Sequence, residues 1–308
     1  MRYFLVLILV NLMWAFQFSG AKIATERLGP ITVTLLPLVL STLMLGPFAF
    51  FDARKRRHQH IPFPRSAWIS FALLGTVGTI ASQLGLTWGV ERSLASNAAV
   101  LTLTIPVLTA VMASILLGER MNLLRWISFA LAIGGVLLVS DIDWHSVRIT
   151  EGRYFFGNVL LLISCLGSAF INSYSKTLLS TFSPAEVLVY SFSIADLVLF
   201  VLALVYEPNS FGRLSGIGWA AWISLLAIAA FSLSVSMLLY FWVIERIDVM
   251  QASLSIYLLP VLGVILSTVL VNEKVTVRLI TGGALVFIST FLITTLDERR
   301  KAEVAADV

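Results

Sequence analysis

Long apolar runs, separated by short polar segments, follow one another along the whole chain. The runs lie at residues 3–24, 31–51, 66–89, 94–117, 123–140, 154–178, 185–206, 217–244, 249–271 and 277–296. A run of about 20 apolar residues crosses a bilayer as an α-helix, because a helix satisfies every backbone hydrogen bond internally. The pattern therefore predicts an all-α integral membrane protein with ten transmembrane helices.

The two halves of the chain repeat one pattern without a gap. Residues 88–120, WGVERSLASNAAVLTLTIPVLTAVMASILLGER, return 154 positions later as 242–274, WVIERIDVMQASLSIYLLPVLGVILSTVLVNEK. The matching pairs include Trp88/Trp242, Glu91/Glu245, Arg92/Arg246, Pro106/Pro260 and Glu119/Glu273. An apolar bias produces chance matches of leucine and valine, but it does not place these residue types in one register. The chain is therefore interpreted as one five-helix module written twice.

Because each module crosses the membrane five times, the second module has the inverted topology relative to the first. This inverted repeat is the plan of many secondary transporters, which bind substrate in a central cavity between the repeats. We divide the chain into a first repeat at 1–150, a second, inverted repeat at 151–297 and a cytoplasmic tail at 298–308. With the N-terminus inside, thirteen Lys and Arg fall on inner segments and seven on outer ones. This bias predicts a multi-pass protein of the cell inner (plasma) membrane with both termini in the cytoplasm.

Composition excludes a soluble globular protein. The chain is 58% hydrophobic and 12% charged, against about 45–50% and 25% in soluble domains, and its mean hydropathy is +0.94. The lone Cys165 can form no intrachain disulfide, and the three histidines fall in polar loops, so we expect neither a metal nor another cofactor.

The motifs of common enzyme classes do not occur in the predicted helices. The sequence has no H-E-x-x-H, no G-x-S-x-G, no paired-aspartate motif and no Walker motif, so we expect neither catalysis nor direct use of ATP. A secondary transporter accounts for the repeat and for the polar residues at mid-membrane depth. A channel or a structural membrane protein is the alternative class, and saturable, competed transport would exclude it. The expected partners are a small-molecule substrate, the lipid bilayer and coupling protons, but no nucleic acid.

Several motifs resemble those of a known family. They are a Trp and a Lys in the first helix, small and amide residues ahead of Pro-Val in the fourth and ninth, Leu-Gly-Glu-Arg at 117–120, Arg125-Trp126 and Gly134-Gly135. Together they are similar to the drug/metabolite transporter superfamily, EamA type, over nearly the whole chain. The resemblance implies a basket of ten helices around a central cavity and export of amino acids or other small metabolites. Residues 37–44 lack the arginine that the second helix often carries in this family, and Asn272 replaces the glycine of the second Gly-Glu motif.

Asp196 lies near the middle of the seventh predicted helix, with no charged residue within nine positions on either side. A charge at this depth costs at least roughly 2.5–3.5 kcal/mol, so the carboxyl is expected to face a cavity or a partner. It could couple transport to protons or serve as counter-ion to a substrate amine. The alternative is a hydrogen-bonded structural carboxyl. We favour the functional role because the repeat counterpart, Thr42, is neutral.

Two helix faces are expected to line the same axial space. Asn11, Trp14, Phe18 and Lys22 recur at helical spacing, and their repeat counterparts are Cys165, Ser168, Asn172 and Lys176. The alternative for the aromatic residues is packing against lipid. For Lys22 and Lys176 the alternatives are snorkelling to the interface, or a gate or anion contact.

The fourth and ninth helices carry further candidates. Asn97 and Gln251 are equivalent positions, Ser255 lies one turn beyond Gln251, and Tyr257 is close by. Pro106 and Pro260 remove a backbone hydrogen bond at mid-membrane depth, which predicts a hinge or, alternatively, an ordinary kink. Glu119 and its counterparts at helix ends are interpreted as interfacial caps, with gating as the alternative. In the third helix, small residues predict close helix packing, and Gln83 is the polar exception.

These considerations define the candidate site and the class of substrate. The substrate-binding candidates are Trp14, Phe18, Gln83, Asn97, Asn172, Asp196, Gln251, Ser255 and Tyr257, and the gate and hinge candidates are Lys22, Pro106, Lys176 and Pro260. Aromatic, amide and hydroxyl groups without a central arginine cluster argue against multiply charged phosphates. They favour an amino acid or a similar amphipathic metabolite. The alternative is a larger cationic or nucleoside-like metabolite or drug, held by stacking and by Asp196.

Overall fold

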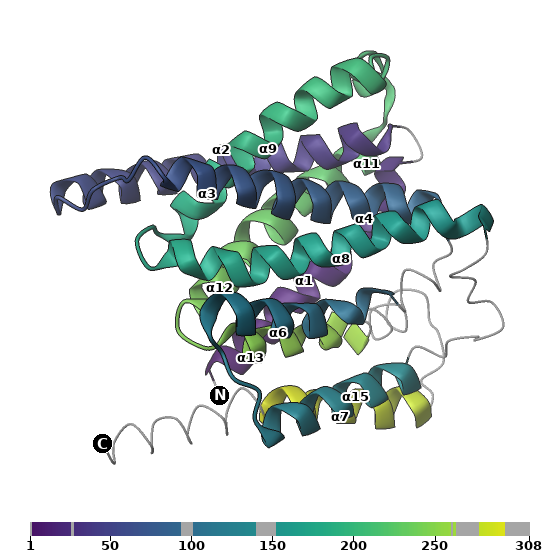
Figure 1. Cartoon of the computed structure of the whole chain (residues 1–308). Helices are drawn as coiled ribbons and strands as arrows, with labels where there is room; N and C mark the ends of the chain where they lie inside the picture. The colour runs from purple at the N-terminus through teal and green to yellow at the C-terminus, as the bar shows by residue number, and fades with distance from the viewer. Residues whose placement is uncertain are drawn as a thin grey trace.

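Helices make up every regular element that the structure describes. This computed structural model describes residues 2–25, 28–93, 101–139, 152–259, 261–262 and 277–292 (Figure 1). Five of its helices are long and apolar enough to cross a membrane, namely Pro30–His58, Ala67–Gly89, Tyr154–Leu179, Pro184–Tyr206 and Trp219–Ile244. Shorter apolar helices cover Arg2–Gln17, Thr104–Leu117, Leu123–Gly135 and Ile280–Phe291. The protein is therefore an all-α, membrane-embedded, multi-pass protein; the predicted count of ten depends partly on 94–100 and 263–276, outside the described residues.

The described elements follow one another in this order along the chain. They are α1 (Arg2–Thr25), α2 (Pro30–His58), α3 (Ala67–Leu73), η1 (Leu74–Ile80), α4 (Ala81–Glu91), α6 (Thr104–Leu117), α7 (Leu123–Val139), α8 (Gly152–Leu179), α9 (Pro184–Tyr206), α10 (Ser210–Arg213), η2 (Leu214–Gly216), α11 (Trp219–Ala227), η3 (Ile228–Val235), α12 (Ser236–Ile244), α13 (Val249–Leu254), η4 (Ser255–Tyr257) and α15 (Val277–Phe291). The α3, η1 and α4 segments form one continuous helix, as do α11, η3 and α12.

The helices stack in layers (Figure 1). The α2 and α9 helices pack against each other at one side of the stack, and α7 and α15 pack together at the other. Between these layers α8 packs against α4 and α6, and α1 packs against α12. The turns at 59–66, 118–122, 180–183 and 245–248 lie on the same side of the bundle as the first residues of α1, at the left of Figure 1. We call this side the basic end.

Two π-helical segments interrupt long helices at matching places in the two halves. They cover Leu74–Ile80 and Ile228–Val235 and begin 154 residues apart. Thr79 Oγ1 donates to the Leu74 carbonyl oxygen at 3.2 Å, and Ser234 Oγ donates to that of Ala229 at 2.7 Å, each five residues back. π-helical turns are rare and occur often at functional sites. Their duplication is a structural trace of the sequence repeat.

Small residues bring the third long helix close to its neighbours. A Cβ atom at Gly75 would lie 2.5 Å from the Ser191 carbonyl oxygen of α9, and one at Gly85 would lie 3.0 Å from that of Leu160 in α8. Larger residues at these positions would push the helices apart. Packing through small residues is common between membrane helices, and it holds the polar faces of α4 and α8 in contact.

Carboxylates tie α2 and α9 together at both ends. At the basic end, Ser183 and Glu186 form a capping box that starts α9, and Glu186 Oε1 accepts a bond from Arg56 Nε at 2.9 Å. At the opposite end, the Glu207 carboxylate accepts bonds from the backbone nitrogens of Ile31 and Thr32, both at 2.9 Å. These carboxylates satisfy amide groups that the first turn of a helix leaves without partners.

Candidate functional site

Asp196 lies in the contact between α2 and α9. Thr42 Oγ1 and Asp196 Oδ2 are 2.7 Å apart, and Asp196 Oδ1 is buried without a hydrogen-bond partner among the described residues. Thr42 Oγ1 is also 3.0 Å from the Leu38 carbonyl oxygen, which it can reach as a donor. The Thr42 hydroxyl therefore donates both to Asp196 and to the backbone of its own helix. The hydrogen bond of Asp196 reaches α2, not the helices that hold the other candidates.

The predicted polar face of α1 meets η3, α12 and η4. Asn11 is fully buried, and its Nδ2 donates to Ser255 Oγ at 3.0 Å. Trp14 Nε1 donates to the Ser232 carbonyl oxygen at 3.2 Å, and the Trp14 ring lies 5.2 Å from that of Tyr240. Ser255 of η4 and the ring of Tyr240 therefore both contact the face of α1 that carries Asn11 and Trp14.

Two polar atoms beside this face are buried without partners. Asn11 Oδ1 and the Tyr240 hydroxyl have no hydrogen-bond partner among the described residues. Buried polar groups are nearly always paired in native proteins, so an unpaired group calls for an explanation such as a bound water or ligand. Sequence reasoning did not single out Tyr240, because one tyrosine in an apolar run gives no signal of its own.

The equivalent face of α8 meets α6 and α4. Asn172 Nδ2 donates to Thr109 Oγ1 at 3.3 Å, and Cys165 Sγ lies 3.4 Å from the Leu101 carbonyl oxygen. Cys165 and Leu101 are the repeat counterparts of Asn11 and Ser255. Both polar faces thus contact the equivalent segment of the other repeat, and on the α1 face Trp14 also packs against the Tyr240 ring.

The fourth and ninth helices change their winding at equivalent positions. Tyr257 ends the 3-10 segment η4, and its hydroxyl donates to the carbonyl oxygen of its own repeat counterpart, Leu103, at 3.1 Å. The helix is interrupted at Leu103, so the buried Pro106 belongs to the first turn of α6. Pro106 has no backbone N–H and cannot donate a helical hydrogen bond to the residue four positions back. The break in the helix therefore comes just before Pro106.

Gln83 and Gln251 are both engaged with protein groups. Gln83 Oε1 accepts a bond from Gln17 Nε2 at 2.7 Å, which links α4 to α1. Gln251 is buried and completes the capping box of α13, where its Oε1 accepts from the Asp248 backbone nitrogen at 3.3 Å. Gln251 therefore stabilises the start of α13, and Gln83 lies beside the polar face of α1.

Lys176 and Glu119 join three elements at the basic end. Lys176 Nζ, in the last turn of α8, donates to the Ile247 carbonyl oxygen at 2.6 Å and lies 3.7 Å from Glu119 Oε1. The Glu119 carboxylate also accepts bonds from the backbone nitrogens of Val249 at 2.7 Å and Met250 at 3.0 Å. The side chain of Glu119 is only 7% exposed. The segment after α6 is thereby fastened to the start of α13.

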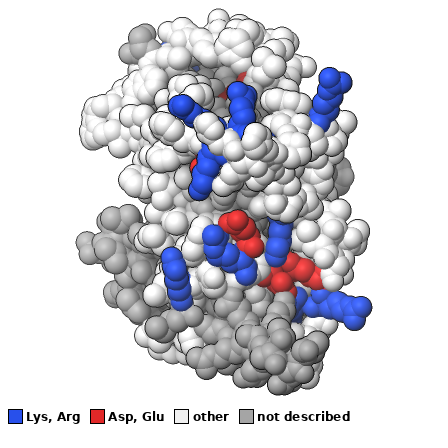
Figure 2. Space-filling model, turned by 90° about the vertical axis from the view of Figure 1, so that its left-hand side faces the viewer, with Lys and Arg blue, Asp and Glu red and all other residues white. Residues whose placement is uncertain are grey.

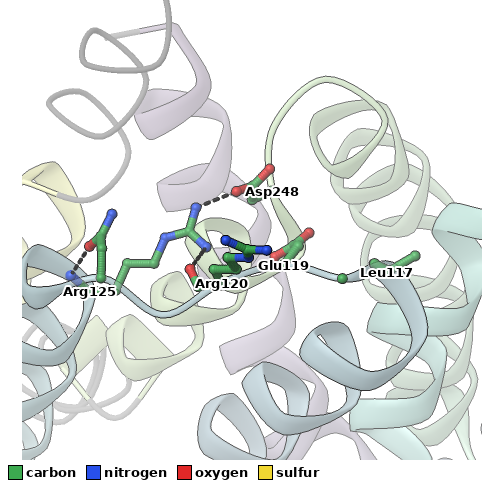
Figure 3. Close-up of a pocket in the computed structure, with 7 residues that line it drawn as sticks. Leu117, Glu119, Arg120, Arg125 and Asp248 are labelled. Atoms are coloured by element: carbon green, nitrogen blue, oxygen red, sulfur yellow. Dashed lines mark hydrogen bonds and ion pairs between the residues drawn. The ribbon is translucent and has the colours of Figure 1, made fainter. Parts of the chain in front are cut away.

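Arg125 strengthens the same closure (Figure 3). Its guanidinium bonds to the Asp248 carboxylate and donates to the Arg120 carbonyl oxygen at 2.9 Å. Beside it lies a pocket of about 420 Å³, lined by Leu117, Gly118, Glu119, Arg120, Asn122, Arg125 and Asp248. None of the predicted substrate-binding residues lines this pocket. The sequence indicated Glu119 through the repeat, but the contact between Arg125 and Asp248 depends on how two distant turns fold.

Four of the predicted site residues cannot be placed. Asn97 and Pro260 lie outside the described residues, as do the side chains of Phe18 and Lys22. In the part of the chain that is described, no three His, Cys, Asp or Glu side chains gather in a way that could hold a metal ion.

Comparison with known proteins gives one consistent result. The model of the EamA-like transporter family matches residues 1–141 and 155–295. The uncharacterized transporter YoaV of Bacillus subtilis is 22% identical over 300 residues, covering 96% of this chain and 97% of that protein. A probable terminal-alkyne amino-acid exporter of Streptantibioticus cattleyicolor is 24% identical over 302 residues, covering 96% and 95%. A solved crystal structure covering 97% of this chain superposes with a TM-score of 0.76 at 15% identity, which indicates the same fold.

Proposed function

Since the protein belongs to the EamA-like transporter family, we propose that it is a secondary transporter that exports amino acids or similar small metabolites by alternating access. The buried, unpartnered Asn11 Oδ1 and Tyr240 hydroxyl beside the Trp14 ring carry this proposal. They offer a hydrogen-bond acceptor and a hydroxyl next to an aromatic wall, which suits an amphipathic substrate with an apolar or planar side group. The related probable amino-acid exporter supports the same class.

The proposed architecture is ten transmembrane helices in two inverted repeats, at 1–150 and 151–297, with a tail at 298–308. Two contacts between equivalent residues, Thr42 with Asp196 and Leu103 with Tyr257, support it; each joins positions 154 apart. Equivalent residues of an inverted pair can touch only at or beside the two-fold axis that relates the repeats. The matching π-helical segments point the same way.

The basic end is proposed to face the cytoplasm. Arg54, Lys55, Arg57 and Arg65 lie exposed there, whereas Arg92 and Arg213 lie exposed at the opposite end. Figure 2 looks at the basic end and shows blue side chains scattered across it. Cytoplasmic loops carry an excess of Lys and Arg, so this asymmetry supports cytoplasmic termini in the cell inner (plasma) membrane.

Lys176 and Glu119 are proposed to form the cytoplasmic gate. Access from the basic end requires the start of α13 to separate from the segment that follows α6. The bonds from Val249 and Met250 to Glu119 must break in that movement, and Lys176 must release the Ile247 carbonyl oxygen. The interrupted segments beside Pro106 and Pro260 would serve as hinges for it, because broken helices bend more easily than continuous ones.

Substrate binding to the purified protein tests the proposal. The unfolding midpoint is measured in detergent against a panel of amino acids, nucleosides and sugar phosphates, because a ligand that binds the folded state raises it. We expect amino acids with apolar or aromatic side groups to raise the midpoint, and Trp14→Ala to reduce the shift. Stabilisation by sugar phosphates alone would contradict the proposed substrate class. Leu43→Ala, at a residue exposed on the surface of α2, is the matched control and should keep the shift.

A further inference from the structure

Four cationic side chains cluster at the projecting end of α2. Arg54, Lys55 and Arg57 belong to its last turns, Arg65 belongs to the turn before α3, and all four are exposed. We propose that these four residues, the α2 basic patch, bind the anionic phospholipid headgroups of the membrane surface.

The length of α2 places this patch at the level of the headgroups. Its 29 residues extend about 43 Å at 1.5 Å per residue, whereas the hydrocarbon core is about 30 Å thick. Figure 1 shows the end of α2 and the turn that follows it projecting beyond the other helices. Phe50, Phe51 and Trp68, which flank the basic residues, are 64%, 65% and 52% exposed. Exposed aromatic residues beside cations are typical of the interface between hydrocarbon and water.

Arg56, in the middle of the basic run, has a different role. Its Nε bonds to Glu186 Oε1 at 2.9 Å, and its guanidinium lies 5.2 Å from the Phe63 ring and 5.0 Å from the Phe182 ring. It also donates to the Ile61 carbonyl oxygen at 3.4 Å. Arg56 therefore fastens the end of α2 and the turn at 59–66, which carries Arg65, to α9.

The charges of the patch are not neutralised by the protein. None of the four forms an ion pair with any residue that the structure describes, and Asp52, two residues before Arg54, supplies one negative charge against four positive ones. Elsewhere at the basic end, ion pairs join Arg246 to Glu245 at 2.6 Å and Lys176 to Glu119 at 3.7 Å. Figure 2 shows the difference: blue and red mix in the lower half, and blue dominates the upper half.

Anionic headgroups supply the missing counter-charge. Phosphodiester oxygens accept short, charge-assisted bonds from guanidinium groups, and clusters of Lys and Arg beside a transmembrane helix attract anionic lipid. Because α2 packs along α9, lipid bound at the patch would anchor that whole layer. The inference does not depend on the identity of the transported substrate.

Competition between lipids tests this inference. The full-length protein is purified in a neutral detergent with equal amounts of phosphatidylglycerol and phosphatidylcholine, and the retained lipid is counted by native mass spectrometry. We expect phosphatidylglycerol to be retained in clear excess at low salt and the excess to shrink at high salt, because salt screens exposed charges. Arg54→Gln, Lys55→Gln, Arg57→Gln and Arg65→Gln combined should bring the ratio of the two lipids close to one.

Three controls separate the outcomes. Replacing Arg54, Arg57 and Arg65 by Lys keeps the charge and should keep the excess, and Arg92→Gln with Arg213→Gln at the opposite end should leave it unchanged. If the fourfold variant does not fold, the single variants Arg54→Gln and Arg65→Gln should each lower the ratio. The proposal would be overturned if the ratio of retained phosphatidylglycerol to phosphatidylcholine were the same in the fourfold Gln variant as in wild type. Displacement of the lipid by an equal concentration of soluble glycerol phosphate would also overturn it.

Discussion

Thr42 and Asp196 occupy the same position in the two halves of the chain, 154 residues apart, and contact each other at 2.7 Å. A neutral residue in one repeat thus serves as the partner of the acid in the other. The pair lies midway between two carboxylate contacts, Glu186 with Arg56 and Glu207 with Thr32. The α2 and α9 helices are therefore joined at three levels, and the acid is part of that joint.

Replacement of Asp196 should separate its hydrogen bond from its charge. Asp196→Asn keeps an oxygen that accepts from Thr42 Oγ1 and should leave the free energy of unfolding close to that of wild type. Asp196→Ala removes the bond and should cost about 1 kcal/mol. Denaturant unfolding in detergent measures both, with Thr42→Val as the partner in a double-mutant cycle. A loss for Asn as large as that for Ala would show that the carboxyl acts through its charge.

The Tyr240 hydroxyl should be dispensable for folding and needed for binding. It is buried without a partner among the described residues, so Tyr240→Phe should leave the unfolding midpoint unchanged or raise it. If the hydroxyl bonds the substrate, its loss should weaken substrate affinity about 2- to 10-fold. Titration of the midpoint shift with substrate measures this change. Tyr257→Phe is the matched control: its hydroxyl bonds Leu103, so it should lower stability instead, and unchanged affinity in Tyr240→Phe would contradict the proposed site.

Cys165 provides a native reporter of the proposed gate. It is the single cysteine of the chain and is buried in α8. Glu119→Ala removes the acceptor of the Val249 and Met250 amides and the partner of Lys176, so the basic end should open more often. Labelling of Cys165 by a small maleimide should then be faster than in wild type. An unchanged rate would argue against Glu119 as part of a gate, and Glu245→Ala, whose ion pair with Arg246 is exposed, should leave the rate unchanged.

Arg125 should matter more for stability than its position near a helix end suggests. Its side chain is 2% exposed and bonds to Asp248. The Asp248 side chain is 22% exposed and also caps α13, so Arg125→Ala leaves that carboxylate partly compensated and should cost about 2 kcal/mol in the free energy of unfolding. Arg120→Ala is the control, because Arg125 contacts Arg120 through its backbone oxygen. A loss below about 1 kcal/mol for Arg125→Ala would place the pair among weak surface interactions.

The hydropathy pattern predicted the helices because lipid-buried segments must be long and apolar. The 154-residue offset also predicted which elements are equivalent. The π-helical segments were not predictable, because the residues of Leu74–Ile80 and Ile228–Val235 carry no signal that separates a π-helix from an α-helix. The offset identified Thr42 as the counterpart of Asp196. It did not show that the two residues are in contact, because that depends on how α2 and α9 pack against each other.

Contacts between side chains of different helices were harder to predict than which residues share one face of a helix. Helical spacing placed Asn11 and Trp14 on one face of α1, but it could not show that this face meets Tyr240. Gln251 looked like a lining residue because it is an amide in an apolar run, whereas its oxygen caps α13. Such contacts depend on the rotation and depth of each helix, which tertiary packing decides.

Exchange transport in proteoliposomes tests the central claim most directly. Vesicles that contain the purified protein are loaded with an unlabelled amino acid, and uptake of the labelled compound is followed at increasing outside concentration. The proposal predicts saturable uptake that inside substrate accelerates, that related amino acids compete, and that Tyr240→Phe weakens. Uptake that rises linearly without competition, or that occurs with sugar phosphates alone, would contradict an alternating-access amino-acid transporter.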